Sequence, residues 1–599
     1  MTTTRDAAPT LSGMGALVAP EGTGFRVWAP HADAVSVIGS FNDWQSDVHP
    51  MIHEEGGYWY GFVPGARPGD EYKFELVTGD GRLQKVDPYA AQVTSSVGNG
   101  VIYDHARFDW RGDDFTCPPH NELVIYELHI GTYAGEGAED GDGELADVAG
   151  SLDHLVRLGV NAIQLMPVAE FAGDYSWGYN PAHIFAVEST YGGPDALKAL
   201  VRAAHRRGIA VILDVVYNHF GPSDLNLWQF DGWSENGLGG IYFYNDWRSA
   251  TPWGDTRPDY GRGEVRQFIR DNALMWLSQF HLDGLRYDMT PYMRSVDASG
   301  MDIPEGWSLC RWINDQVRAT YPDKILIAED LHSNPAVTST APDGAAFHAQ
   351  WDARFVHPVR GALIPADDAW RSTTQVAAAI SHSYGDAFAR VIYTESHDEV
   401  ANGKARVPQE IDADDPTGYY ARKRSTLGAG LVFTAPGIPM LFQGQEFLEG
   451  GWFRDTVGVD WDQREEFHGI VRLYRDLVRL RLNRTGLTAG LTGQGVLVFH
   501  NNDDANLIAF QRWRDHGPGD DVVVVANLSA STLLDYRIGF PAPGHWQLVF
   551  NSDAVVYSDD FGGEVSGDVH ATEDDYDGLD ASGTLGIGAY TLLVYAWQG

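Results

Sequence analysis

The segment HLDGLRYD, residues 281–288, is the stretch around which the rest of the chain is organised. Residues 282–287 mix apolar and β-prone side chains, which predicts a short buried strand, and Gly284 allows another backbone to approach closely. Arg286 and Asp288 stand two positions apart, so their side chains leave the same face of the strand. A permanent cation beside a buried carboxylate lowers the pKa of that carboxylate, and we therefore expect Asp288 to be ionised. A structural ion pair would look the same, so this segment alone does not identify a functional site.

Length and composition indicate a large globular protein. A chain of 599 residues is too long for one hydrophobic core, and its 44% hydrophobic content suits about three domains. It contains no apolar run of the roughly 18 residues that a membrane helix needs, and its start lacks the apolar core of a signal peptide. Two cysteines, Cys117 and Cys310, cannot build a disulfide framework. These features predict a cytoplasmic protein.

The net charge of −41 limits the partners of the chain. Such a charge argues against nucleic acid and against anionic membranes as partners. A neutral ligand such as a sugar suits it better than a phosphorylated one. Scattered acidic residues are usually a solvated surface, with tolerance of high salt as a lesser alternative.

The pattern of strands and helices changes twice along the chain. Short strands with turns, typical of a β-sandwich, dominate the first part and return after about Gly490. Between them, apolar strands alternate with helices, which predicts a parallel sheet covered on both faces and, at this length, a closed (β/α)8 TIM barrel. We therefore expect an α/β barrel flanked by two all-β domains. The expected ranges are a flexible tail at 1–18, an N-terminal β-sandwich at 19–115, the barrel at 120–488 with an inserted lobe at 217–263, and a C-terminal β-sandwich at 489–599.

Polar residues follow one predicted barrel strand after another. They are Asp214 after the third strand, Arg286 and Asp288 after the fourth, Glu329 after the fifth, and His397 and Asp398 after the seventh. Active residues of such barrels come from the carboxyl ends of different strands, so we expect these side chains to converge on one rim.

Three acids at one rim suggest glycoside chemistry. A retaining mechanism needs two carboxyl groups about 5 to 5.5 Å apart, one ionised and one protonated. Asp288 suits the ionised nucleophile, while burial and neighbouring acids would raise the pKa of Glu329 and make it the proton donor. Asp398 would favour the positively charged transition state. His219 and His397 would donate hydrogen bonds to sugar hydroxyls.

Four segments resemble the signature regions of the α-amylase family, glycoside hydrolase family 13. They are DVVYNH at 214–219, GLRYD at 284–288, AED at 328–330 and ESHDE at 395–399. The resemblance implies that Asp288 is the nucleophile, Glu329 the general acid and base, and Asp398 the stabiliser of the transition state. It also implies substrate-binding residues, namely Asp214, His219, Arg286, His397 and Tyr179, the last stacking beneath the cleaved sugar.

Other segments bear on the reaction. Residues 25–31 and 87–90 resemble the carbohydrate-binding module of glycogen branching enzymes, and 125–131 and 396–400 resemble the same enzymes. Residues 328–332, AEDLH, depart from the pattern usual in bacterial branching enzymes. Further stretches look like maltooligosyltrehalose trehalohydrolase: 191–194, 217–222, 251–255 and 347–352.

The leading interpretation is a 1,4-α-glucan branching enzyme. It would cleave α-1,4 links of amylose, glycogen, starch or maltooligosaccharides by a retaining double displacement and transfer the chain to a 6-hydroxyl. The alternatives are a hydrolase of the same family, either an α-amylase or the trehalohydrolase, and a glucan-binding protein without activity. The presence of all three acids argues against the last.

Asn218 matches a residue that ligates calcium in many α-amylases. A calcium site needs six to eight oxygen ligands, which this lobe does not supply. We expect no metal and no cofactor.

Overall fold

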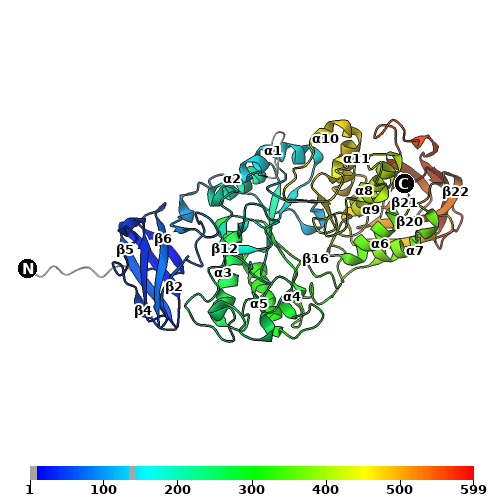
Figure 1. Cartoon of the computed structure of the whole chain (residues 1–599). Coiled ribbons are helices and arrows are strands. Elements are labelled where there is room, and N and C mark those ends of the chain that lie inside the picture. The colour runs from blue at the N-terminus through cyan, green and yellow to red at the C-terminus, as the bar shows by residue number, and fades with distance from the viewer. Residues whose placement is uncertain (1–9, 134–141) are drawn as a thin grey trace, which may run out of the picture.

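The computed structural model describes residues 10–133 and 142–599. Three parts follow one another along an elongated molecule, with the N-terminal sandwich at one end, the barrel in the middle and the C-terminal domain at the other end (Figure 1). The fold expected from the sequence is confirmed. Among the described helices, none is long and apolar enough to cross a membrane.

The N-terminal domain is a sandwich of two antiparallel sheets. One sheet contains β1 (Gly15–Ala19), β2 (Gly22–Trp28), β5 (Tyr58–Pro64) and β4 (Ile52–Glu54), in that order. The other contains β3 (Ala34–Gly39), β6 (Glu71–Thr78), β7 (Gly81–Lys85) and β8 (Gly100–Val101). Strand β1 pairs with β2 over its whole length, so the flexible tail predicted for 1–18 was wrong from Gly15 onward. Residues 1–9 of that range lie outside the described residues.

Eight parallel strands close into the central barrel. In order around the barrel they are β9 (Ile125–Leu128), β10 (Ala162–Leu165), β13 (Ala210–Val215), β14 (Gly284–Tyr287), β15 (Ile325–Ala328), β16 (Ala349–Trp351), β17 (Arg390–Ile392) and β18 (Ile438–Phe442), which pairs with β9. Every residue of the eight strands is buried, and most of them are apolar, because helices cover the outside and side chains fill the inside. Strand β16 was not predicted from the sequence; it has three residues, and a glutamine stands at its centre.

Helices α1 to α9 lie between consecutive barrel strands, and α10 and α11 follow the last strand, β18. The longer ones are α1 (Leu145–Leu158), α2 (Gly193–His205), α3 (Gly263–Gln279), α5 (Pro304–Thr320), α6 (Ala353–Leu363), α7 (Thr373–Ser381), α9 (Tyr419–Thr434) and α11 (His468–Arg481). Short helices α4 (Pro291–Arg294), α8 (Val407–Ile411) and α10 (Asp462–Glu466) lie in the connecting segments.

The central strand explains the glycine of the opening segment. Strand β14 begins at Gly284, two residues later than predicted. A Cβ atom at this glycine would lie 2.5 Å from the carbonyl oxygen of Ile325 on β15, so no larger residue fits without displacing the backbone. The close approach keeps β14 and β15 in register, with Tyr287 opposite Ala328. Asp288 and Glu329 therefore occupy the first positions beyond two neighbouring strands.

A long segment between β13 and α3 forms the lobe expected at 217–263. It contains two short 3-10 helices, Gly240–Tyr242 and Trp247–Ser249. The N-terminal domain packs on it: Lys85 donates to the carbonyl oxygens of Asn226 and Trp228, and the amide and ring of His31 contact the buried Asp231.

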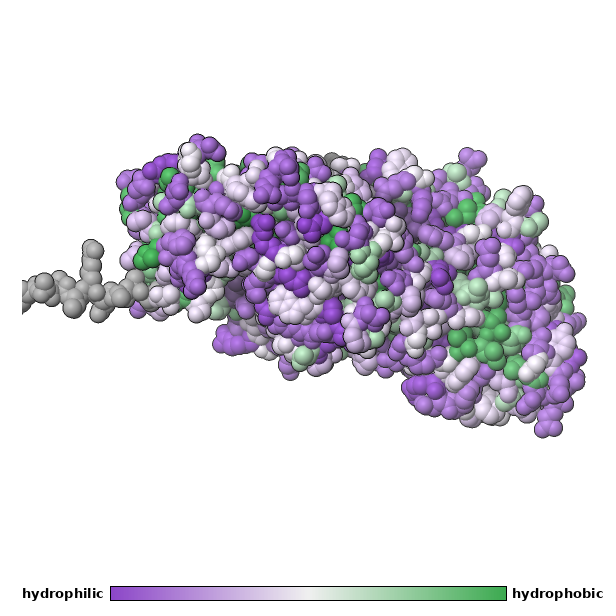
Figure 2. Space-filling view, turned by 90° about the horizontal axis from the view of Figure 1, so that it is seen from below, coloured by the Kyte–Doolittle hydropathy of each residue, from purple (hydrophilic) through white to green (hydrophobic). Residues whose placement is uncertain are grey.

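The C-terminal domain also has two sheets. The larger contains β19 (Gly495–Asn502), β20 (Leu507–Trp513), β21 (Val522–Asn527), β26 (Thr591–Trp597), β23 (Gly544–Asn551) and β24 (Val569–Ala571), and β22 (Leu533–Phe540) pairs with β25 (Ala581–Ile587) in the smaller. Figure 2 shows a mostly hydrophilic face, with hydrophobic residues gathered at the end where this domain lies.

Candidate active site

Arg286 occupies the centre of the rim and is completely buried. Its Nη1 atom donates to Asp214 Oδ2 and lies 3.3 Å from Asp288 Oδ1, and its Nη2 atom lies 2.8 Å from Glu329 Oε2. The guanidinium also stacks over the ring of Trp351, 4.2 Å from its centroid. The sequence predicted Asp288 as the main partner of Arg286, whereas the contacts with Asp214 and Glu329 are the shorter ones.

The charges of Asp288 and Glu329 depend on each other. Burial and the neighbouring Glu329 raise the pKa of Asp288 well above its usual value, and they outweigh Arg286 and the Asn218 amide, which lower it. Burial and Asp398 likewise raise the pKa of Glu329 against the opposing charge of Arg286. The prediction that the cation would keep the pKa of Asp288 low was wrong, because desolvation outweighs the attraction. We infer that the two adjacent carboxyls hold one proton between them.

Hydrogen bonds distinguish the two carboxyls. Asp288 Oδ2 accepts a hydrogen bond of 2.6 Å from the Asn218 side-chain amide, which favours its ionised form. Glu329 Oε2 accepts from the backbone amide of Met289 at 2.9 Å. Its other oxygen, Oε1, is buried and has no hydrogen-bond partner among the described residues. Oε1 is therefore the oxygen best placed to carry the shared proton toward a bound ligand.

Asn218 and His219 support the site from the segment after β13. The Asn218 amide also donates to the Asp288 carbonyl oxygen, so it fixes the nucleophile candidate. Both ring nitrogens of His219 are occupied, by Asn218 Oδ1 and by the Tyr179 carbonyl oxygen at 2.9 Å. This geometry therefore leaves neither ring nitrogen of His219 for the hydrogen bond to a sugar hydroxyl that was expected from the sequence. Trp253 stacks on the ring at 4.4 Å.

Tyr179, His397 and Asp398 form the other side of the site. Tyr179 donates to Asp214 Oδ2 at 2.7 Å, and its ring stacks on that of His397 with centroids 5.1 Å apart. Asp398 Oδ2 lies 3.6 Å from His397 Nε2. With 41% of its side chain exposed, Asp398 is the most accessible of the three acids, because the side chains of Asp288 and Glu329 are 8% and 1% exposed.

The structure thus brings all eight predicted residues to the carboxyl ends of the strands. It adds three that were not predicted there from the sequence: Glu127, Trp253 and Trp351. Glu127 had a signal that could have been used, since it is a charged residue inside the otherwise uncharged strand β9. Trp351 was singled out only within 347–352, as part of the resemblance to trehalohydrolases, and its strand was not predicted.

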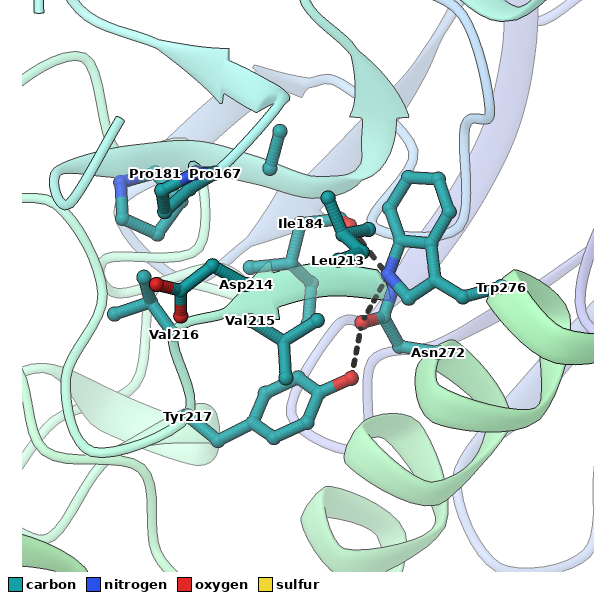
Figure 3. Close-up of a pocket in the computed structure, with 11 residues that line it drawn as sticks. Pro167, Pro181, Ile184, Leu213, Asp214, Val215, Val216, Tyr217, Asn272 and Trp276 are labelled. Atoms are coloured by element: carbon teal, nitrogen blue, oxygen red, sulfur yellow. Dashed lines mark hydrogen bonds between the residues drawn. The ribbon is translucent and has the colours of Figure 1, made fainter. Parts of the chain in front are cut away.

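A small pocket lies beside Asp214 (Figure 3). Its other lining is apolar or internally bonded: Tyr217 and Trp276 both donate to the Asn272 side-chain oxygen, at 2.7 and 3.1 Å. The Tyr217 bond ties the segment after β13 to α3, so we interpret the pocket as a packing gap behind the rim and not as part of the ligand site.

No group of three or more histidines, cysteines, aspartates and glutamates among the described residues could hold a metal ion. Asn218, considered above as a calcium ligand, directs its side-chain oxygen at His219 Nδ1 and its amide nitrogen at Asp288.

Comparison with protein families assigns all three parts of the chain. Residues 133–238 and 254–488 match the α-amylase catalytic domain, more than half of the chain. Residues 13–90 match carbohydrate-binding module 48, described as the isoamylase N-terminal domain, and 498–598 match the α-amylase C-terminal all-β domain.

Curated proteins match nearly the whole chain. A 1,4-α-glucan branching enzyme GlgB of Corynebacterium jeikeium is 33% identical over 96% of this chain and 82% of its own length. The GlgB enzyme of Vibrio cholerae is 32% identical over 96% of this chain and 81% of its own length.

Solved structures share the fold. A pullulanase of Bacillus subtilis complexed with maltose superimposes with a TM-score of 0.77 at 21% identity, covering 99% of this chain and 86% of that one. A pullulanase of Anoxybacillus complexed with maltotetraose has a TM-score of 0.76 at 23% identity, covering 98% and 88%.

Proposed function

Since the chain belongs to the α-amylase family, we propose that it is a 1,4-α-glucan branching enzyme with Asp288, Glu329 and Asp398 as its catalytic acids. The relatives named branching enzyme support the reaction, because they match nearly the whole chain and not only the barrel. The observation that carries the catalytic assignment is the placement of Asp288 and Glu329 side by side beyond β14 and β15, bridged by Arg286.

The first step would transfer a glucan chain to the enzyme. Asp288 attacks the anomeric carbon of an α-1,4 linked glucose, and the bond from that carbon to the leaving oxygen breaks. Glu329 gives its proton to the leaving oxygen, which departs as a hydroxyl. Asp398 stabilises the positive charge that develops on the sugar ring.

The second step would form the branch. Glu329, now a carboxylate, removes the proton from a glucan 6-hydroxyl, and that oxygen attacks the anomeric carbon and releases Asp288. Two inversions retain the α configuration. The contacts of Arg286 fit this sequence, since the negative charge moves from Asp288 to Glu329 in the first step and the same guanidinium touches both.

The second candidate is hydrolysis of α-glucans by the same acids. The observation that favours it is Trp253, which stacks on His219 within the stretch that resembles trehalohydrolases. Water would then replace the 6-hydroxyl in the second step.

Amylose separates the candidates. A branching enzyme lowers the iodine colour while reducing ends rise little, and isoamylase then releases short linear chains. An amylase raises reducing ends in step with the loss of colour. Release of trehalose from maltooligosyl trehalose, with amylose unchanged, would identify the trehalohydrolase.

A further inference from the structure

Glu127 is a buried acid that the proposed reaction leaves without a role. It stands on β9, whose four residues are all buried, and it has no exposed surface. A carboxylate in such a place needs strong partners to offset the loss of hydration. Its partners therefore indicate what it does.

Both oxygens of Glu127 contact the same residue on a distant segment. Oε1 lies 2.8 Å from His397 Nδ1, and Oε2 accepts a hydrogen bond of 3.0 Å from the His397 backbone amide. Gln164 on β10 makes a longer contact with Oε1, at 3.5 Å. Since β18 lies between β9 and β17, this pair of bonds ties the segment after β17 across the rim of the barrel.

The bond to Nδ1 determines what the other ring nitrogen of His397 can do. A carboxylate only accepts, so Nδ1 must carry a hydrogen. If the ring were neutral, Nε2 would then present a lone pair to Asp398 Oδ2, 3.6 Å away. A protonated ring instead directs an N–H and a positive charge at Asp398.

We propose that Glu127 is a positioning residue, which holds His397 in place as a cation so that Nε2 carries a hydrogen toward Asp398 and toward the sugar ring bound beside it. This inference rests on the proposed function for the location of that sugar. The ring of Tyr179 covers one side of His397, and Trp177 and Trp351 lie 5.8 and 5.9 Å from it, centroid to centroid. These aromatic rings exclude water from His397, so the carboxylates of Glu127 and Asp398 must stabilise the positive charge of the imidazolium in its place.

The charges around His397 favour the cation. Asp398 and Glu127 raise the pKa of the imidazole to about 9, against burial and Arg286, which lower it. The titratable and charged groups that face the ring are Glu127, His129, Tyr179, Asp214, Arg286, Glu329 and Asp398. Carboxylates outnumber cations among them, so His397 stays protonated through neutral pH.

The test is Glu127→Gln, which keeps the shape of the side chain and removes its charge. Glutamine can still accept from Nδ1, but its amide nitrogen then cannot accept from the His397 backbone amide, so some loss of stability is expected while the ring loses its proton at a lower pH. We expect kcat on amylose to fall about ten- to a hundredfold at pH 8. The deficit should shrink by at least about threefold at pH 6, where the ring regains its proton. The basic limb of the pH profile should move down by about one unit or more.

A matched control is Glu446→Gln. Glu446 is equally buried and pairs with a histidine, His154, at 2.7 Å, but between α1 and the segment after β18. The Glu446→Gln variant should be less stable than the wild type, but the pH profile of its activity should not shift. A Glu127→Gln deficit that is the same at pH 6 and pH 8, or no deficit at all, would overturn the proposal.

A second measurement needs no variant of Glu127. In the wild-type enzyme labelled with 13C at histidine Cε1, the His397 signal, identified by its loss in His397→Gln, should remain that of an imidazolium at pH 8. A neutral ring at that pH overturns the proposal even if Glu127→Gln fails to fold. Failure of the proposed function is distinguished by the products: hydrolysis would change what amylose yields but not the charge of His397.

Discussion

Arg286→Lys keeps a positive charge at the centre of the site but removes the planar fork. The guanidinium contacts Asp214 and Asp288 through Nη1 and Glu329 through Nη2. The single ammonium nitrogen of lysine cannot contact all three carboxyl groups at once. Arg286 Nη2 and Glu329 form an ion pair at hydrogen-bond distance, and a buried contact of this kind contributes about 1.5 to 3 kcal/mol. Because Glu329 becomes a carboxylate in the transition state, losing its contact alone predicts a loss of about ten- to 150-fold in kcat. Misplacement of Asp288 as well brings the expected loss to about a thousandfold.

The assay is the initial rate of amylose conversion, measured together with the free energy of unfolding from urea titration. Arg390→Lys is the matched control. Arg390 is also fully buried and pairs with Asp352 at 3.0 Å, but it bonds to carbonyl oxygens of α7 on the outside of the barrel. We expect Arg390→Lys to lower the free energy of unfolding by a few kcal/mol, as Arg286→Lys does, but to lower the rate by less than about tenfold. An Arg286→Lys enzyme that keeps a tenth of the wild-type rate, or two variants with equal losses of rate, would refute the reasoning.

Three further predictions follow from the same structure. Asp288→Asn should keep the melting temperature within a few degrees and lower kcat by about a thousandfold or more, measured on amylose; a variant with a tenth of the wild-type rate would contradict the nucleophile. Deleting residues 1–114 should raise KM for long glucans more than for maltooligosaccharides, with some loss of stability because the domain packs on the lobe; equal effects on both substrate lengths in a folded truncation would count against a binding role. His205 lies between Asp113 and Asp283, at 2.7 and 2.8 Å, and these carboxylates raise its pKa although burial opposes them. The contribution of His205 to stability is therefore fully present below about pH 6.5 and is lost as pH rises through the raised pKa. Urea titration should give a smaller free energy of unfolding at pH 9 than at pH 6, and this difference should be smaller in His205→Gln. An unchanged difference in His205→Gln would assign the effect to other groups.

The sequence predicted the barrel and the rim residues because both depend on local patterns. Apolar strands alternate with helices, and polar residues follow the strands, so the positions of Asp214, Asp288 and Glu329 could be predicted without coordinates. The close packing at Gly284 was also predicted, and the structure shows that a Cβ atom at this position would lie only 2.5 Å from Ile325.

The remaining features depend on distant parts of the chain meeting. Arg286 pairs more closely with Glu329, 43 positions later in the sequence, than with Asp288, and spacing along one strand cannot show that. The pKa of Asp288 was predicted in the wrong direction because burial and Glu329 outweigh the neighbouring cation. The bonds from Glu127 to His397 join residues 270 positions apart. Strand β1 was taken for a tail because its few residues gain order only by pairing with β2.

A 1H NMR experiment tests the proposed branching reaction most directly. Amylose is incubated with the enzyme, and the anomeric signals of α-1,4 links, α-1,6 links and reducing ends are counted in the same spectrum over time. If Asp288 passes its glucan chain to a 6-hydroxyl, one α-1,6 link appears for each α-1,4 link that disappears, and reducing ends stay constant. If instead one reducing end appears for each α-1,4 link that disappears and no α-1,6 signal grows, water is the acceptor and the enzyme is a hydrolase.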